Sequence, residues 1–394
     1  MSEQEPSGVR DRLRVGASRA PRAEDAVREV RLALGDVREG CVIFFSSVRY
    51  ERNALSEALA KHFAGARVVG CSTAGEIAPE GYARESMVAV HLPAGEFATV
   101  ATVIDNLSAF APAEGQQRVR QALSSLQERM HAPLSGHTFA LVLIDGLSRQ
   151  EEWVVSTLSS ALGDIPLFGG SAGDDLQFHD TYVYTDGMIP RDSAVLLLVN
   201  TAAPFHVFYT QHFVHTDRKM VVTAADPSAR RVTEINGEPA AREYARLVGL
   251  DVDRLTPMAF AANPVVVRVG GRYYVRSIQK VNPDESLTFF CAIDEGIVLT
   301  VAEGLDIVEN LRNALAEVRQ EVGEPRLIIG CDCVLRRLEV ERKALETEVS
   351  RLLAANRVIG FSTYGEQFNA MHVNQTFTGV AIGAPGDAGR DSVS

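Results

Sequence analysis

A short loop rich in Gly, Ser and Thr occurs three times along the chain, and this repeat constrains the fold more than any other feature. A short apolar run precedes each copy, and another apolar run follows it. A strand–loop–strand segment that recurs in this way indicates internal duplication. The three copies are Gly70-Cys71-Ser72-Thr73-Ala74-Gly75-Glu76, Gly169-Gly170-Ser171-Ala172-Gly173-Asp174 and Gly360-Phe361-Ser362-Thr363-Tyr364-Gly365-Glu366.

The residue types explain the shape of the loop. Gly permits backbone angles that are closed to other residues, and Ser or Thr hydroxyls bond the exposed amides of a tight turn. The acidic residue near the end of each copy can close the turn by accepting hydrogen bonds from those amides.

Each loop belongs to a longer unit that reads helix, strand, helix, strand, loop, strand. The first strands of the three units are the apolar runs at residues 41–45, 139–144 and 326–330. In the third unit, the second helix is a long charged segment from about residue 338 to 355. Strand–helix–strand crossovers imply parallel strands covered by helices. The sequence therefore predicts an α/β fold with largely parallel, helix-covered sheets.

Between the second and third units lies a strand-rich segment, from about residue 204 to 302, with one helix near residues 239–248. Gly270-Gly271 separates two β-rich runs, which is a hairpin signal. The predicted organisation is a disordered basic arm (1–22), an N-terminal domain of two units (23–203), a C-terminal domain of the strand-rich segment plus the third unit (204–383), and a disordered tail (384–394).

Composition excludes several classes of protein. An apolar fraction of 46% and a charged fraction of 23% are those of an ordinary globular protein. The net charge of -12 argues against a nucleic-acid binder. No apolar run approaches the roughly 20 residues that span a bilayer, and the N-terminus lacks the core of a signal peptide. We expect a cytoplasmic protein that does not enter the membrane.

Polar residues follow the first strand of each unit. Because ligands of open parallel sheets bind outside the carboxyl ends of the strands, these positions are candidates for a site, although Ser and Asp there also serve as helix caps. They are Ser46-Ser47, Asp145-Gly146 and Cys331-Asp332-Cys333.

Cysteine offers one candidate metal site. Cys331 and Cys333 are two residues apart, so in a strand they face the same side. A pair supplies only half of the thiolates of an iron–sulfur cluster or a zinc site. The alternative interpretation is two buried thiols that act as small apolar residues.

Histidines and aromatic residues gather in the segment from residue 205 to 215, which contains His206, His212 and His215. An apolar pocket with one imidazole suits a haem, which needs an axial nitrogen ligand and burial of the macrocycle. The same histidines also suit the polar face of a strand. His372 is a further candidate, after the third loop.

Enzymatic signatures are weak. In Gly70-Cys71-Ser72-Thr73-Ala74-Gly75 the second glycine is one place too far for the Gly-x-Ser-x-Gly elbow of hydrolases. No dinucleotide or P-loop motif occurs. We expect a protein that is not an enzyme.

Taken together, these motifs resemble those of the FIST (F-box and intracellular signal transduction) sensor family from about residue 41 to 383. Besides the three loops, the segments that carry the resemblance are residues 221–224, residues 232–240 and Asn374-Gln375-Thr376. Residues 331–337 and 371–379 look most like the haem-binding, nitric-oxide-sensing branch.

This resemblance implies a non-catalytic sensor that regulates a separate histidine kinase or cyclic-di-GMP enzyme (diguanylate cyclase or phosphodiesterase) by contact. A haem that binds nitric oxide would be held by His212 first, with His206, His215 and His372 behind it. The alternatives are a Cys331–Cys333 metal or iron–sulfur sensor and a sensor of a small organic ligand such as an amino acid. A homodimer would suit the duplicated architecture. The pocket for a small organic ligand would consist of Ser72, Thr73, Glu76, Ser171, Ser362, Thr363 and Glu366.

Overall fold

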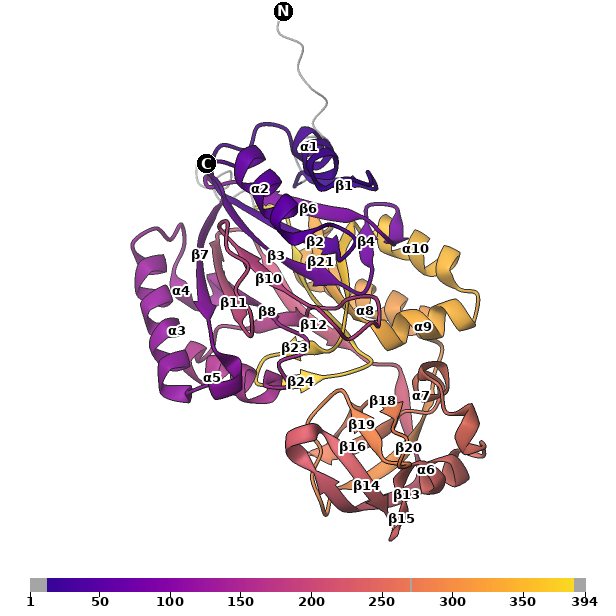
Figure 1. Ribbon diagram of the computed structural model, residues 1–394. Coiled ribbons are helices and arrows are strands. Elements are labelled where there is room, and N and C mark those ends of the chain that lie inside the picture. Colours follow the sequence, from indigo (N-terminus) through magenta and orange to yellow (C-terminus); the bar gives the residue numbers. More distant parts are fainter. Residues whose placement is uncertain (1–12, 270, 386–394) are drawn as a thin grey trace, which may run out of the picture.

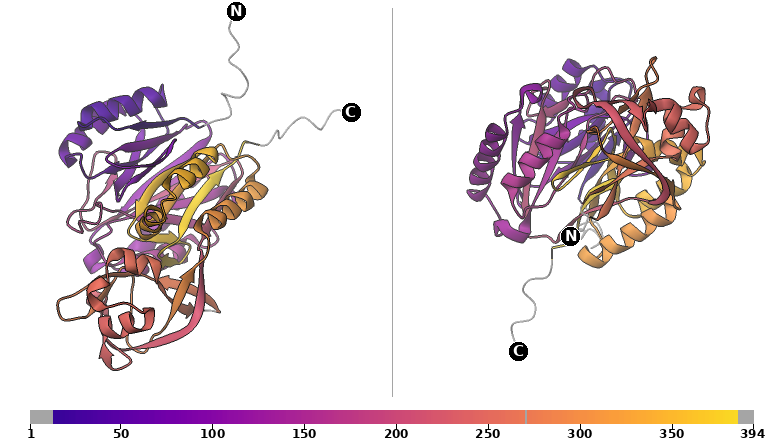
Figure 2. Two further views of the ribbon diagram at one scale, coloured as in Figure 1. Left: turned by 90° about the vertical axis from the view of Figure 1, so that its right-hand side faces the viewer. Right: turned by 90° about the horizontal axis from the view of Figure 1, so that it is seen from below.

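The computed structural model describes residues 13–269 and 271–385. Three α/β modules form a body, and a strand-rich insert protrudes from one end of it (Figure 1; Figure 2, left). Within the described residues, no helix has the length and apolar character needed to cross a membrane.

The three modules share one plan, which confirms the α/β class and the triple repeat. Each has an edge strand, a first helix, a central strand, further helix, a second central strand and a closing strand. The elements of module one are β1 (Val15–Ser18), α1 (Ala23–Leu34), β2 (Cys41–Ser47), α2 (Arg52–His62), β3 (Arg67–Thr73), β4 (Glu76–Ala78), β5 (Gly81–Ala83) and β6 (Met87–Leu92).

Module two follows directly. Its elements are β7 (Phe97–Ile104), η1 (Leu107–Ala109), α3 (Pro112–Gln127), α4 (Leu134–His137), β8 (Thr138–Ile144), α5 (Glu151–Leu162), β9 (Leu167–Ser171), β10 (Val183–Thr185) and β11 (Ala194–Thr201). Those of module three are β12 (Phe205–Thr210), α8 (Ile307–Val322), β21 (Leu327–Cys333), α9 (Val334–Arg342), α10 (Glu346–Ala355), β22 (Val358–Thr363), β23 (Glu366–Phe368), β24 (Met371–Val373) and β25 (Phe377–Ile382).

Each module lends a short arm to the sheet of another module, in a ring. The sheet orders are β1-β6-β2-β3-β10, β7-β11-β8-β9-β23-β24 and β12-β25-β21-β22-β4-β5. Module two thus completes the first sheet with β10, module three completes the second with β23–β24, and module one completes the third with β4–β5. The exchange interlocks the three modules into one body.

The sheets are mixed rather than largely parallel. Only the central pairs β2–β3, β8–β9 and β21–β22 are parallel. The closing strands β6, β11 and β25 pair with them antiparallel. Each module therefore contains one strand–helix–strand crossover of the expected kind. The closing strand after the loop runs antiparallel to the two central strands.

One apolar core lies between the three sheets, and helices cover their outer faces. Phe45 and Phe361 stack there with ring centroids 4.5 Å apart, which joins modules one and three. Helices α1 and α2 cover the first sheet, α3 and α5 the second, and α8 and α10 the third. The continuous apolar runs of the central strands follow from this burial on both faces.

The insert lies inside module three, between its edge strand β12 and its first helix α8. Its strands form one antiparallel sheet in the order β17-β16-β20-β13-β14-β19-β18, with β15 beside β14. The elements are β13 (Phe213–Asp226), η2 (Pro227–Ala229), β14 (Arg231–Ile235), β15 (Glu238–Pro239), α6 (Ala240–Val248), η3 (Val252–Arg254), α7 (Pro257–Ala262), β16 (Val265–Val269), β17 (Arg272–Arg276), β18 (Ile278–Val281), β19 (Leu287–Phe289) and β20 (Val298–Gly304).

Several sequence expectations need correction. The predicted strand at residues 205–209 belongs to the body, because β12 pairs with β25 and not with the insert. The long helix at 338–355 is two helices, because Ala344 between them has a φ of 55°, which no α-helix tolerates. Part of the expected disordered arm is ordered, since β1 pairs with β6. Residues 1–12 and 386–394 lie outside the described residues.

Candidate functional site

The three repeated loops meet and hold one another by backbone hydrogen bonds. In each loop, the residue two places after the Ser that all three copies share donates its N–H to the carbonyl of the equivalent Ser in another module. The bonds are Ala74 N to Ser362 O at 2.9 Å, Tyr364 N to Ser171 O at 3.2 Å and Gly173 N to Ser72 O at 3.1 Å. The repeat of the sequence is thus a repeat of one contact around an approximate threefold axis.

Two of the loops enclose a carboxyl group in the same way. Thr73 and Ser86 bond the carboxyl of Glu76, and Thr363 and Thr376 bond that of Glu366 with identical sequence spacing. Burial raises the pKa of Glu76 to about 7, and burial raises the pKa of Glu366 to about 8, against the hydrogen bonds that lower both. Near neutral pH these carboxyls hold a proton far more readily than an exposed one.

The predicted loop pocket is therefore not a cavity. All of its side chains are fully buried, and most of them bond inside the loops. The residues are Ser72, Thr73, Glu76, Ser171, Ser362, Thr363 and Glu366. The exception is the hydroxyl of Ser362, which has no hydrogen-bond partner among the described residues.

The strand-end positions do lie at equivalent places. Ser47 accepts from Arg49 N at 3.2 Å and Asp145 accepts from Leu147 N at 3.1 Å, so both stabilise the turn after their strand. Neither caps a helix: α2 begins at a cap formed by Glu51. Their role here is structural.

Cys331 and Cys333 are both buried at the end of β21, and burial raises the pKa of each thiol well above its ordinary value. A thiolate is the form that binds a metal, so this environment disfavours ligation. In the part of the chain that the structure describes, no three His, Cys, Asp or Glu side chains gather as a metal site. A metal site at this pair stays a prediction, and no third ligand joins the two cysteines among the described residues.

His212, the first choice for a haem ligand, has both ring nitrogens engaged. Its Nδ1 accepts from the Arg336 guanidinium at 2.9 Å, and its Nε2 donates to Glu339 at 2.9 Å. Since a guanidinium only donates, the ring is neutral with its proton on Nε2. Burial lowers the pKa of His212, in agreement with the neutral form. These bonds leave no nitrogen for an iron, so His212 does not fit a haem.

The other three histidines lie apart. His206 is half-buried on β12 in the body, whereas His215 is exposed on β13 and stacks on Tyr273 at 4.1 Å. The segment from 205 to 215 crosses from one sheet to another, so it is not one strand with a shared face. His372 lies on β24, with Nδ1 3.2 Å from the Gln367 amide and a buried Nε2 that has no partner among the described residues.

A cluster of buried, unpaired polar atoms surrounds His372 where the insert meets the body. Most buried polar groups in proteins have a hydrogen-bond partner. Several unpaired polar atoms in one place therefore indicate a site where a ligand binds. The insert contributes Arg276 and Ser277, at the end of β17. The unpaired atoms are Arg276 Nη1, Ser277 Oγ, Gln367 Oε1, His372 Nε2, Asn374 Nδ2 and Oδ1, and Gln375 Oε1.

His372 lies beside Gln367 and Asn374, and Arg276 acts electrostatically on it. A Cβ placed on Gly365 would be 2.7 Å from His372 Nε2 and 3.0 Å from Asn374 Nδ2, so both atoms border the same point. Gln375 donates to Ala261 O of the insert at 3.0 Å. The repeated loop, the β23–β24 arm and the insert thus converge on one polar region, which we call the junction cluster.

Charges beside the junction cluster come from α5 and the insert. The guanidinium of Arg230 bonds Glu151 at 2.6 Å and Glu152 at 2.5 Å. Burial lowers the pKa of His372, while Glu152 and Glu151 oppose that shift. A neutral imidazole is the form that both donates and accepts, which suits a polar ligand.

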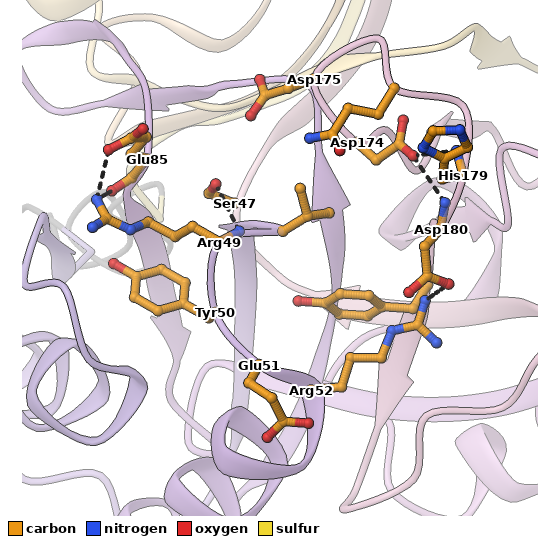
Figure 3. A pocket seen from close by; sticks show the side chains of 13 residues that line it. Ser47, Arg49, Tyr50, Glu51, Arg52, Glu85, Asp174, Asp175, His179 and Asp180 are labelled. Carbon is orange, nitrogen blue, oxygen red and sulfur yellow. Dashed lines mark hydrogen bonds and ion pairs between the residues drawn. The ribbon is translucent and has the colours of Figure 1, made fainter.

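A cavity of about 470 Å³ lies elsewhere, after β2 (Figure 3). Both of its arginines are already paired, since Arg49 bonds Glu85 at 2.8 Å and Arg52 bonds Asp180. No described residue that lines it has a buried polar atom without a partner. The junction cluster is therefore the stronger candidate site.

The sequence pointed to His372 as a candidate ligand but not to the rest of the cluster. Asn374-Gln375 is a run of amides with the same spacing from its loop as Arg84-Glu85 has from the first loop. Arg276 and Ser277 could not be predicted as site residues, because nothing in the sequence shows which strand of the insert faces the body.

Comparisons with known proteins agree with the repeat motifs. An uncharacterized protein of Methanocaldococcus jannaschii is 23% identical over 388 residues, which cover 87% of this chain and 73% of that protein. A solved structure of PurLQS from Thermotoga maritima aligns with 95% of this chain and 72% of its own, but its identity of 11% and TM-score of 0.20 carry no argument.

Family models match most of the chain. The FIST N domain matches residues 40–238, and the FIST C domain matches residues 240–369. The first range runs from just before β2 through module two into the insert, and the second runs from the start of α6 to just after β23. The chain belongs to the FIST family of sensory signal-transduction proteins.

Proposed function

We propose that this protein senses a small polar organic ligand, such as an amino acid, held in the junction cluster between the insert and the body. The observation that carries the proposal is the set of buried polar atoms without partners contributed by both parts. Each such atom costs about 1–3 kcal/mol when unpaired, so a ligand that bonds several of them gains affinity.

The chemistry of the cluster favours a zwitterion. Arg276 Nη1 is a charged donor suited to a carboxylate, whereas the side-chain oxygens of Gln367, Asn374 and Gln375 accept from an ammonium group. Binding between two parts of a chain shifts their relative position if the two states bind the ligand differently. The protein would report that shift by contact with a separate histidine kinase or cyclic-di-GMP enzyme, without catalysis of its own.

Two buried asparagines provide the test. Asn374 has no partner for either polar atom, whereas Asn200 bonds His131 N, Ala132 O and Thr138. We expect Asn374→Ala to leave the stability of the ligand-free protein unchanged or raised, and Asn200→Ala to lower it by about 2 kcal/mol. Urea unfolding measures both.

Ligand binding completes the test. Thermal unfolding is measured with a panel of free amino acids and hydroxy acids, and a hit should raise the melting temperature of the parent protein but not of Asn374→Ala. An Asn374→Ala protein as destabilised as Asn200→Ala, or one that keeps the shift, would remove the junction cluster as the site.

A haem-based nitric-oxide sensor is the second candidate, and the free Nε2 of His372 is the observation that favours it. The fit is poor, because that nitrogen lies 2.7 Å from the point where a Cβ of Gly365 would sit, and amide groups surround it. An absorption spectrum after haem addition separates the candidates: a Soret band lost in His372→Ala would favour haem.

A further inference from the structure

A second cavity, of about 210 Å³, lies after β8. Its lining comes from module two, the insert and the third loop, and includes none of the unpaired atoms of the junction cluster. The volume is below the roughly 300 Å³ at which pockets for drug-sized ligands begin, so the cavity suits a single substituted ring.

Aromatic side chains form one wall of this cavity. Phe178 lies 4.8 Å from Tyr364 and 5.8 Å from Phe290, and Phe290 lies 6.0 Å from Tyr364, measured between ring centroids. The three rings come from the loop after β9, the insert and the loop after β22. Tilted and edge-to-face packing is favourable for a further ring placed against them.

The polar part of the cavity is positively charged. Arg149, Arg230 and Lys280 line it, against one acidic residue, Glu151. The buried Arg230 bonds both Glu151 and Glu152 and so adds no free positive charge, whereas Arg149 and Lys280 form no ion pair with any described residue. Arg149 and Lys280 are both exposed, so their charges are open to solvent as well as to the cavity.

We propose that this cavity binds an aromatic carboxylate, with its ring against Phe178, Phe290 and Tyr364 and its carboxylate between Arg149 and Lys280. Such a ligand satisfies both features of the cavity at once: the rings exclude a purely polar anion, and the unpaired cations disfavour a neutral ring. Because it contacts the insert and two modules, it would act on the same junction as the ligand of the junction cluster, but at a separate site.

Isothermal titration of the full-length protein tests the proposal with phenylacetate as the probe. We expect saturable binding of one phenylacetate per chain, and binding of acetate and of 2-phenylethanol at least about tenfold weaker. Arg149→Gln and Lys280→Gln should each weaken phenylacetate binding about tenfold, and Phe178→Leu should weaken it severalfold. Lys61→Gln, on the distant helix α2, is the matched charge control and should change nothing.

Three results would overturn the proposal. They are no phenylacetate binding at millimolar concentration, equal binding of 2-phenylethanol, and unchanged affinity in both Arg149→Gln and Lys280→Gln. Asn374→Ala separates the two sites, because it should leave phenylacetate binding intact while it removes the ligand response of the junction cluster.

Discussion

At the scale of single residues, the buried carboxyls of Glu76 and Glu366 stabilise the repeated loop. Each carboxyl closes its loop through two hydroxyl side chains and one backbone amide. When Glu366 is protonated, one oxygen accepts from Thr376 N and the other can donate to Thr363. The sequence predicted that the acidic residue closes the turn, but not that it would be buried with its pKa raised.

The raised pKa of Glu366 predicts a pH dependence of stability. The folded state holds this proton up to about pH 8, whereas an exposed Glu releases it near 4.5, so the free energy of unfolding falls as pH rises between these values. Over that range the loss is roughly 5 kcal/mol. Glu366→Gln keeps both kinds of hydrogen bond without a charge and should flatten the dependence.

Urea unfolding at several pH values measures this effect. Glu76→Gln should act in the same direction over a narrower range, because the pKa of Glu76 is raised only to about 7. Glu57→Gln, exposed on α2, is the control. A Glu366→Gln protein with the pH profile of the parent would show that this carboxyl is ionised in the folded state.

At the scale of elements, the loop between β9 and β10 is the place where the second module departs from the other two. Its carboxylate, Asp174, accepts from Phe178 N, His179 N and Asp180 N at 2.9, 2.7 and 2.9 Å. Three of its residues are left-handed, namely Asp175, Leu176 and Phe178. Sequence periodicity does not detect such a loop, because single side chains and not a repeating pattern stabilise it.

Tyr364, from the third loop, fixes this conformation. Its hydroxyl bonds the Asp174 carboxylate and accepts from Leu176 N at 2.7 Å. We expect Tyr364→Phe to lower the free energy of unfolding by about 2 kcal/mol, because two buried partners lose their bond. It should also speed proteolytic cleavage within residues 175–180. Tyr209→Phe, half-buried on β12, is the control, and equal effects of the two substitutions would contradict this role.

At the scale of the whole molecule, the sequence predicted three α/β units and a strand-rich insert, because apolar periodicity and the repeated loop are local signals. The exchange of β4–β5, β10 and β23–β24 between modules was not predictable, since each arm is only one or two strands of three residues and pairs with a strand far away in the sequence. The junction cluster depends on that exchange: β23–β24 carries Gln367 and His372 to the second sheet, where Arg276 of the insert meets them.

We therefore expect one ligand to contact both the insert and the body. A crystal structure of the protein with the strongest hit of the amino-acid and hydroxy-acid panel tests this most directly. The account predicts a ligand whose carboxylate contacts Arg276 of the insert and whose remaining polar groups contact Asn374 or Gln375 of the body. A ligand bound by residues of only one of these two parts would contradict it.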